Sequence, residues 1–138
     1  MVKVILGNKG SGNTKELLNA VNAAAAEAKG SVVCIEKGTD LTYDVKHSVR
    51  LISATEYGID SYKFLQGFLS GLHGGNFDIC EVFVDGLCKV TGSNADTLAE
   101  AAEFLAWCEN FGAARGVNFT IAMGVDPETA PEDIKKYC

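Results

Sequence analysis

Five short apolar runs, separated by segments with helical periodicity, limit what this chain can fold into. Each run is mostly apolar, with no more than one charged or hydroxyl residue, and is rich in β-branched or aromatic residues. A strand of this kind is apolar on both faces, so it must be covered on both sides, as in parallel sheets flanked by helices. The runs are residues 2–6, 32–35, 49–52, 79–84 and 119–123.

Helical patterns fill most of the space between these runs. Apolar side chains recur at helical spacing in residues 14–29, 60–72 and 94–115. Residues 131–136 begin with proline, continue with two acids and end with two lysines, which is the order that the helix dipole favours. Gly30 and Gly116 stand where a glycine often follows a helix. The alternation predicts one α/β domain over residues 1–138. We expect a three-layer, open, mostly parallel sheet of about five strands with helices on both faces.

The polar segment 36–48 interrupts this pattern, and it is consistent with either a loop or a short hairpin.

Composition excludes several classes of protein. The formal net charge is −6 and the lysines are scattered among acids, so a nucleic-acid partner is not expected. No apolar run approaches the roughly 20 residues that span a bilayer, and the opening residues do not resemble a signal peptide. The five cysteines include no CxxC pair, and three lie in apolar runs. These features predict a cytoplasmic protein with buried thiols and no membrane partner.

A glycine-rich loop connects the first predicted strand to the first predicted helix. Three glycines allow successive backbone N–H groups to point inward, and the helix N-terminus adds its positive dipole. The loop therefore predicts an anion site that binds the phosphates of a nucleotide. The expected ligand-binding residues are Gly7, Asn8, Lys9, Gly10, Ser11, Gly12, Asn13, Thr14 and Lys15.

Asn13 occupies the position where a phosphate-binding loop usually has its lysine. Asparagine donates a hydrogen bond but cannot neutralise charge on a transferring phosphoryl group. Lys9, within the loop, could compensate. Lys15 lies about 100° further round the helix, which turns it away from the phosphates.

A second candidate residue ends the fourth apolar run. Asp85 follows Val82, Phe83 and Val84, which places its carboxylate at the carboxyl end of a strand expected near the first. Thr14 and Asp85 are therefore the expected Mg²⁺ ligands, the threonine through its hydroxyl and the aspartate through water. An ordinary aspartate in a strand-to-helix turn is the alternative. Asp126 follows the fifth run, where it could contact a base or ribose, or simply start a turn.

These motifs carry a family resemblance. Residues 7–14 resemble a Walker A motif and residues 82–85 a Walker B motif, and the layout is similar to the RecA-like branch of P-loop NTPases and to thymidine kinases. The whole chain also resembles small bacterial P-loop proteins catalogued as twitching-motility ATPase-like. The resemblance implies a P-loop NTPase fold that binds ATP or GTP with Mg²⁺. Two features depart from it: Gly86 stands where RecA-like hydrolases place a glutamate, and the zinc ribbon and catalytic glutamate of thymidine kinases are missing.

Three functions are consistent with these residues. The first is a nucleoside-phosphate-binding protein that acts as a nucleotide-dependent switch or weak NTPase. The second is a pseudo-NTPase scaffold that binds a protein partner without nucleotide turnover, and the third is a small-molecule kinase. No catalytic residue is assigned, because both the charge stabiliser and the base are missing from their expected positions. The broad apolar face of residues 94–115 leaves a homo-oligomer open.

Overall fold

The sheet at the centre of the molecule has five strands, all parallel. The computed structural model describes residues 1–8, 13–93 and 98–138. The strands lie in the order β1-β5-β4-β2-β3, which confirms the prediction of an α/β domain with a parallel sheet of about five strands. Their bounds are β1 Val2–Leu6, β2 Ser31–Glu36, β3 Val49–Ser53, β4 Ile79–Asp85 and β5 Asn118–Met123.

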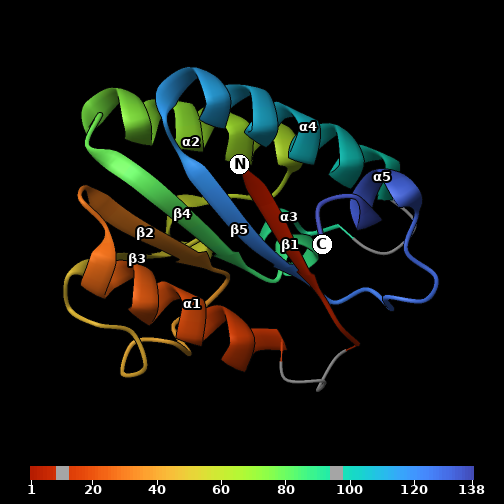
Figure 1. Cartoon of the computed structure of the whole chain (residues 1–138), viewed down its shortest axis with the longest axis horizontal. Coiled ribbons are helices and arrows are strands. Elements are labelled where there is room, and N and C mark those ends of the chain that lie inside the picture. Colours follow the sequence, from red (N-terminus) through yellow and green to blue (C-terminus); the bar gives the residue numbers. More distant parts are fainter. Residues whose placement is uncertain (9–12, 94–97) are drawn as a thin grey trace.

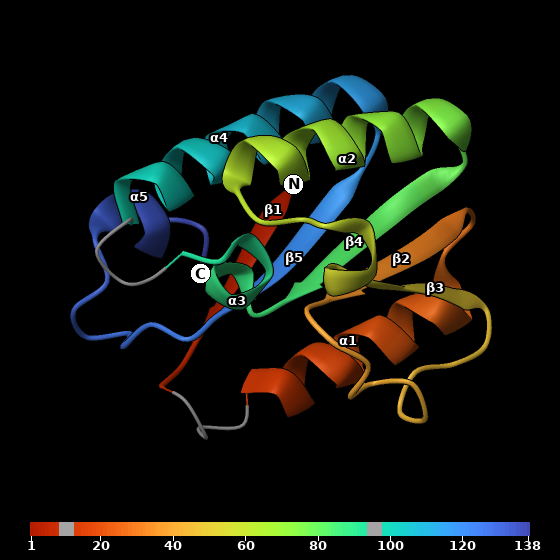
Figure 2. The same cartoon turned by 180° about the vertical axis from the view of Figure 1, so that it is seen from behind.

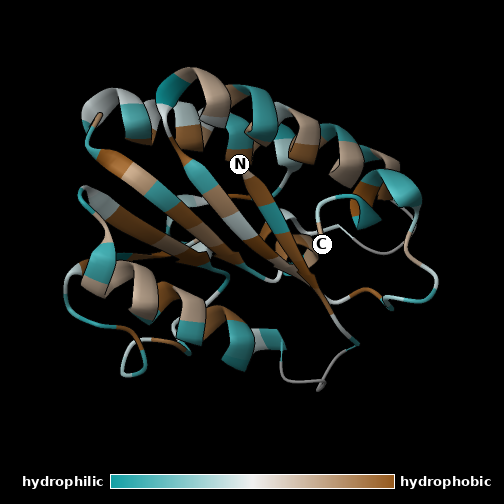
Figure 3. Ribbon diagram, in the orientation of Figure 1, coloured by the Kyte–Doolittle hydropathy of each residue, from teal (hydrophilic) through white to brown (hydrophobic). Residues whose placement is uncertain are grey.

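Both faces of the sheet are buried. Successive side chains of each strand point to opposite sides, so every strand contributes to both faces. In β2, Val33 and Ile35 join the larger of two hydrophobic clusters, and Val32 and Cys34 join the smaller one. Figure 3 shows the strands mostly in hydrophobic colours and the helices with hydrophilic residues among apolar ones. The mostly apolar runs of the sequence thus supply side chains to both clusters.

The helices divide between the two faces. Helix α1 packs into the smaller cluster, whereas α2 and α4 lie side by side over the opposite face of the sheet (Figures 1 and 2). Among the described residues, no helix combines the length and apolar character needed to cross a membrane. The helix bounds are α1 Asn13–Glu27, α2 Tyr62–Gly75, α3 Leu87–Thr91, α4 Leu98–Arg115 and α5 Glu132–Lys135, with a 3-10 turn, η1, at Thr55–Tyr57.

Strand β1 is at the edge of the sheet, and the C-terminal segment covers its free side. The backbone N–H of Val4 donates to the carbonyl oxygen of Tyr137 at 3.0 Å. Ile134 and Tyr137 are buried against the larger cluster. An uncovered edge strand is a template for aggregation, so this contact protects the strand that leads into the glycine-rich loop.

The segment between β2 and β3 is a series of turns, so of the two alternatives for residues 36–48 the loop is the correct one. The loop is held to β2 by Glu36, whose carboxylate accepts a hydrogen bond from the backbone N–H of Leu41 at 3.2 Å. It is held to α1 by Asn22, which donates to the carbonyl of Asp44 and accepts from the N–H of Lys46.

Gly30 has a different role from the one predicted. Its backbone is not left-handed, unlike that of Gly116, which ends α4 at a φ of 73° as expected. At Gly30 a side chain has no space, because a Cβ would overlap the carbonyl oxygen of Asp78. That oxygen accepts a hydrogen bond from the N–H of Ser31 at 2.9 Å, so it cannot move away freely.

Substituting Gly30 by alanine is therefore expected to lower the free energy of unfolding by about 1–3 kcal/mol, the usual cost of overpacking. Gly71, an exposed position in α2 where an added Cβ would meet nothing within 4 Å, is the control. There the same change should stabilise the protein by about 0.5–1 kcal/mol, because alanine favours helix. Urea unfolding of both variants measures the difference, and equal effects would contradict the close approach at Gly30.

Candidate functional site

A crevice lies where the carboxyl ends of β1, β5 and β4 meet their following segments. The chain leaves β1 through α1 on one face of the sheet and leaves β4 toward α4 on the other (Figures 1 and 2). In open α/β sheets, ligands bind at such a change of direction. The described residues that line the crevice are Asn13, Thr14, Asp85, Gly86, Cys88, Lys89 and Gly124.

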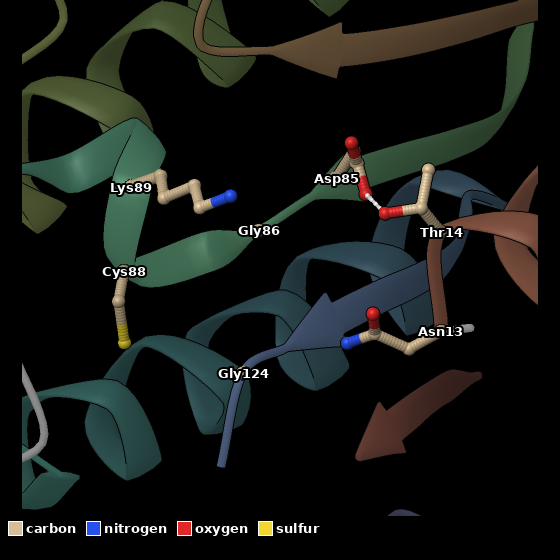
Figure 4. A pocket seen from close by; sticks show the side chains of 7 residues that line it. All are labelled: Asn13, Thr14, Asp85, Gly86, Cys88, Lys89 and Gly124. Carbon is tan, nitrogen blue, oxygen red and sulfur yellow. Dashed lines mark hydrogen bonds between the residues drawn. The ribbon is translucent and has the colours of Figure 1, made fainter. Parts of the chain in front are cut away.

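The two predicted metal ligands meet in this crevice. The hydroxyl of Thr14 donates a hydrogen bond to Oδ1 of Asp85 at 3.2 Å, although 71 positions separate them (Figure 4). Thr14 is in the first turn of α1, and Asp85 is the last residue of β4. Strand β5 lies between β1 and β4, so the contact is made across the mouth of the crevice and not between neighbouring strands.

The Asp85 carboxyl is in an unfavourable environment for its charge. Burial raises the pKa of Asp85 above its usual value, while the Thr14 hydrogen bond and the positive charge of Lys89 act in the opposite direction. Asp40 adds a further, repulsive negative charge. A cation close to Asp85 would relieve this energetic cost.

Asn13 lines the crevice and also binds the end of β5. Its Nδ2 donates to the carbonyl oxygen of Met123 at 3.4 Å, and the backbone N–H of Gly7 donates to the same oxygen at 3.3 Å. Both groups tie the end of β1 and the start of α1 to the end of β5. The N–H of Gly7 therefore already has a hydrogen-bond partner within the protein.

Two further residues of the predicted loop are described, and neither contributes to the crevice. Asn8 and Lys15 are exposed, and neither lines it. Lys15 thus lies away from the crevice, as its position on α1 predicts. Four further predicted positions lie outside the described residues: Lys9, Gly10, Ser11 and Gly12.

The loop after β5 forms a turn. Oδ1 of Asp126 accepts a hydrogen bond from the N–H of Glu128 at 2.9 Å, and its carbonyl accepts one from the N–H of Thr129 at 3.2 Å. Of the two alternatives for Asp126, the structure shows the start of a turn. From this loop, only Gly124 lines the crevice.

Sequence reasoning missed a second carboxylate near Asp85. Glu36 ends β2 and is the register partner of Asp85 on β4, and it is 3% exposed. Burial raises the pKa of Glu36, and the hydrogen bond from Leu41 opposes the shift. The signal was present in the sequence, because Glu36 follows an apolar run as Asp85 does.

Sequence reasoning also missed helix α3 and the residues that it brings to the crevice. This helix begins immediately after Gly86, whose φ of 78° strongly favours glycine. A glutamate here, as in RecA-like hydrolases, would place a side chain on a left-handed backbone. Cys88 and Lys89 of α3 both line the crevice (Figure 4).

The crevice is small for an organic ligand. Its volume is about 250 Å³, slightly below the range of roughly 300–1,000 Å³ for small-molecule sites. Among the described residues, no three His, Cys, Asp or Glu side chains converge as a metal site. Thr14 and Asp85 instead offer two hard oxygen ligands, which suits a Mg²⁺ ion that takes its other ligands from phosphates and water.

No family model matches this chain, and no curated protein matches its sequence. The assignment of a function therefore depends on the geometry of the crevice.

Proposed function

We propose that the protein binds a nucleoside phosphate, ATP or GTP, together with Mg²⁺, and acts as a nucleotide-dependent switch or weak NTPase of the P-loop type. The observation that carries this proposal is the 3.2 Å contact between Thr14 and Asp85 at the change of chain direction. A hydroxyl at the start of a helix and a carboxylate at the end of a strand are the two protein ligands that phosphate-bound Mg²⁺ uses in P-loop enzymes.

Each residue has a defined part in this proposal. Thr14 and Asp85 would hold the metal, which neutralises phosphate charge and orients the phosphate chain. Asn13 fixes the start of α1 against β5 through Met123. Turnover should be slow, because position 86 is a glycine and Glu36 does not line the crevice, so neither provides an evident base for an attacking water. The five free cysteines fit a reducing cytoplasm, which is the compartment we propose.

One observation favours the scaffold alternative. The N–H of Gly7 and one N–H of the Asn13 side-chain amide donate to the carbonyl of Met123, which leaves two fewer donors for phosphate than the sequence suggests. A protein that had lost nucleotide binding could keep these contacts for stability alone.

A thermal-melt titration with Mg²⁺-ATP and Mg²⁺-GTP separates the two functions. Ligand at 100 times its Kd adds about 2.7 kcal/mol of stability, which raises Tm by roughly 5–15 °C for a domain of this size. Nucleosides without phosphates and Mg²⁺ alone are the controls and should produce little shift. Unchanged melting at millimolar nucleotide would refute nucleotide binding and leave the scaffold.

Replacing Asn13 by lysine should strengthen triphosphate binding by about 1–3 kcal/mol, because a charged donor would reach the phosphates. The same change removes the hydrogen bond to Met123, so the ligand-free protein should lose about 1 kcal/mol of stability. Asn13→Gln, which adds length without charge, is the matched control. Calorimetric titration measures the affinities, and equal affinity for all three proteins would contradict a phosphate position beside residue 13.

A further inference from the structure

Helix α3 holds its residues in a fixed position beside the crevice. Its buried side chains, Leu87, Val90 and Thr91, anchor it in the molecule. Left-handed glycines at both ends, Gly86 and Gly92, fix where it starts and stops. The two remaining interior residues, Cys88 and Lys89, are left to face the crevice.

A chain of hydroxyl groups fixes the far end of α3. Oγ1 of Thr91 donates to the carbonyl of Leu87 at 2.8 Å and lies 2.8 Å from Oγ of Ser93, which donates to the Tyr62 hydroxyl at 3.0 Å. Tyr62 is buried at the start of α2. These bonds connect α3 to a helix of the main core, so its orientation is not set by the five-residue helix alone.

The aliphatic part of Lys89 lies over Gly86. A Cβ at position 86 would be 3.4 Å from Cδ of Lys89 and 3.6 Å from its Cβ. The glycine thus leaves space for the lysine stem to lie close to the backbone, and the ammonium group is directed along the crevice wall toward Asp85 (Figure 4). Burial raises the pKa of Asp85, and the positive charge of Lys89 opposes this rise, as expected from its position.

The other charged side chains described at or beside the crevice are acidic. Asp85 lines it, Glu36 is beside Asp85 in the sheet, and Asp40 acts on both carboxyls. These carboxylates repel a polyphosphate. Among the described residues that line the crevice, Lys89 is the one with a positive charge.

We propose that Lys89 binds the phosphate chain of the ligand and supplies, from helix α3, the positive charge that Asn13 does not provide. This inference rests on the proposed nucleotide binding and adds the residue that makes an acidic crevice accept an anion. Lysine binds phosphate as a point charge, so it needs proximity and not the fixed fork geometry of arginine.

The test compares Lys89→Met with Lys89→Arg and with Lys29→Met. Methionine keeps the aliphatic stem that covers Gly86 and removes only the charge. Lys29 is exposed and precedes β2, so it lies at the amino ends of the parallel strands, whereas the crevice lies at their carboxyl ends. Binding of Mg²⁺-ATP and of inorganic tripolyphosphate with Mg²⁺ is measured by calorimetry at several salt concentrations. Circular dichroism and melting of the ligand-free variants report whether they remain folded.

We expect Lys89→Met to bind both ligands about 10- to 100-fold more weakly and with a smaller dependence on salt, while Lys89→Arg and Lys29→Met keep most of the affinity. If the wild type binds Mg²⁺-ATP and Lys89→Met binds equally well, Lys89 does not bind phosphate, and the proposed function stands. If the wild type binds neither ligand, nucleotide binding fails and this inference with it. Equal weakening by Lys89→Met and Lys29→Met would indicate a general effect of net charge and would also overturn the assignment.

Discussion

Asp85→Asn should abolish the Mg²⁺ dependence of nucleotide binding and weaken Mg²⁺-ATP binding by about 100-fold or more, a loss on the order of 3 kcal/mol. The carboxylate is one of two protein oxygens available to the metal, and the amide that replaces it is a weak ligand for a hard cation. Without Mg²⁺, the same variant should bind tripolyphosphate as well as the wild type or better, because a repulsive charge has been removed. Titrations with and without a chelator measure both effects.

Asp78→Asn provides the matched control, since Asp78 is exposed and immediately precedes β4, at the end opposite Asp85. It has the same change in net charge and should bind as the wild type does. A wild-type response to Mg²⁺ in Asp85→Asn would remove Asp85 from the metal site.

Asp85→Asn should also change how stability depends on pH. Because burial raises the pKa of Asp85 above its usual 3.8, the folded state binds this proton more tightly than the unfolded state. The wild type therefore loses stability as the pH rises from 3.8 through the raised pKa, and the variant avoids this loss. Its advantage in Tm should be small at about pH 3.5, increase with pH and then level off. A constant difference across this range would contradict the environment described for Asp85.

Phe104→Ala should produce the largest loss of stability among the substitutions considered, about 3–5 kcal/mol, because it leaves a cavity in the larger cluster. Phe104 is fully buried, with its ring centroid 5.8 Å from that of Tyr62 and 6.1 Å from that of Trp107. Urea unfolding measures the effect, and Phe104→Leu, which keeps most of the volume, should lose about 1–2 kcal/mol. The leucine variant remains informative if the alanine variant does not fold.

The same substitution at an exposed phenylalanine isolates the effect of burial. Phe77 is 81% exposed in the turn before β4, and Phe77→Ala should change stability by no more than about 0.5 kcal/mol. Similar losses at both positions would mean that Phe104 does not fill the core as described.

The strands could be predicted because the two faces of the sheet leave a strong pattern. A strand such as β2, covered on both sides, has no polar position between Val32 and Ile35. The parallel arrangement follows from the helices between the strands, except for β2 and β3, which a loop connects. The order of the strands could not be predicted. It depends on the pairing of β1 with β5, which is a long-range contact with no local signal.

Part of the site could also be predicted, because the sequence shows where strands end and helices begin. Thr14 stands at the start of a predicted helix and Asp85 at the end of a predicted strand. The sequence therefore indicates that both lie at the carboxyl ends of the parallel strands. Lys89 was missed because α3 has five residues, too few to show helical periodicity. The partner of Asn13 was missed because Met123 accepts through its backbone carbonyl, which no sequence pattern reveals.

The pairing of β1 with β5 has a consequence for synthesis on the ribosome. Val2 pairs with Phe119 and Leu6 with Met123, so strand β1 has no complete strand partner until residue 123 has been made. At ~5–20 residues per second, the interval is roughly 6–24 s. During that time a β-branched, apolar strand is a potential substrate for chaperones. The crevice cannot assemble earlier, so a ligand would act on this chain only after β5 has emerged.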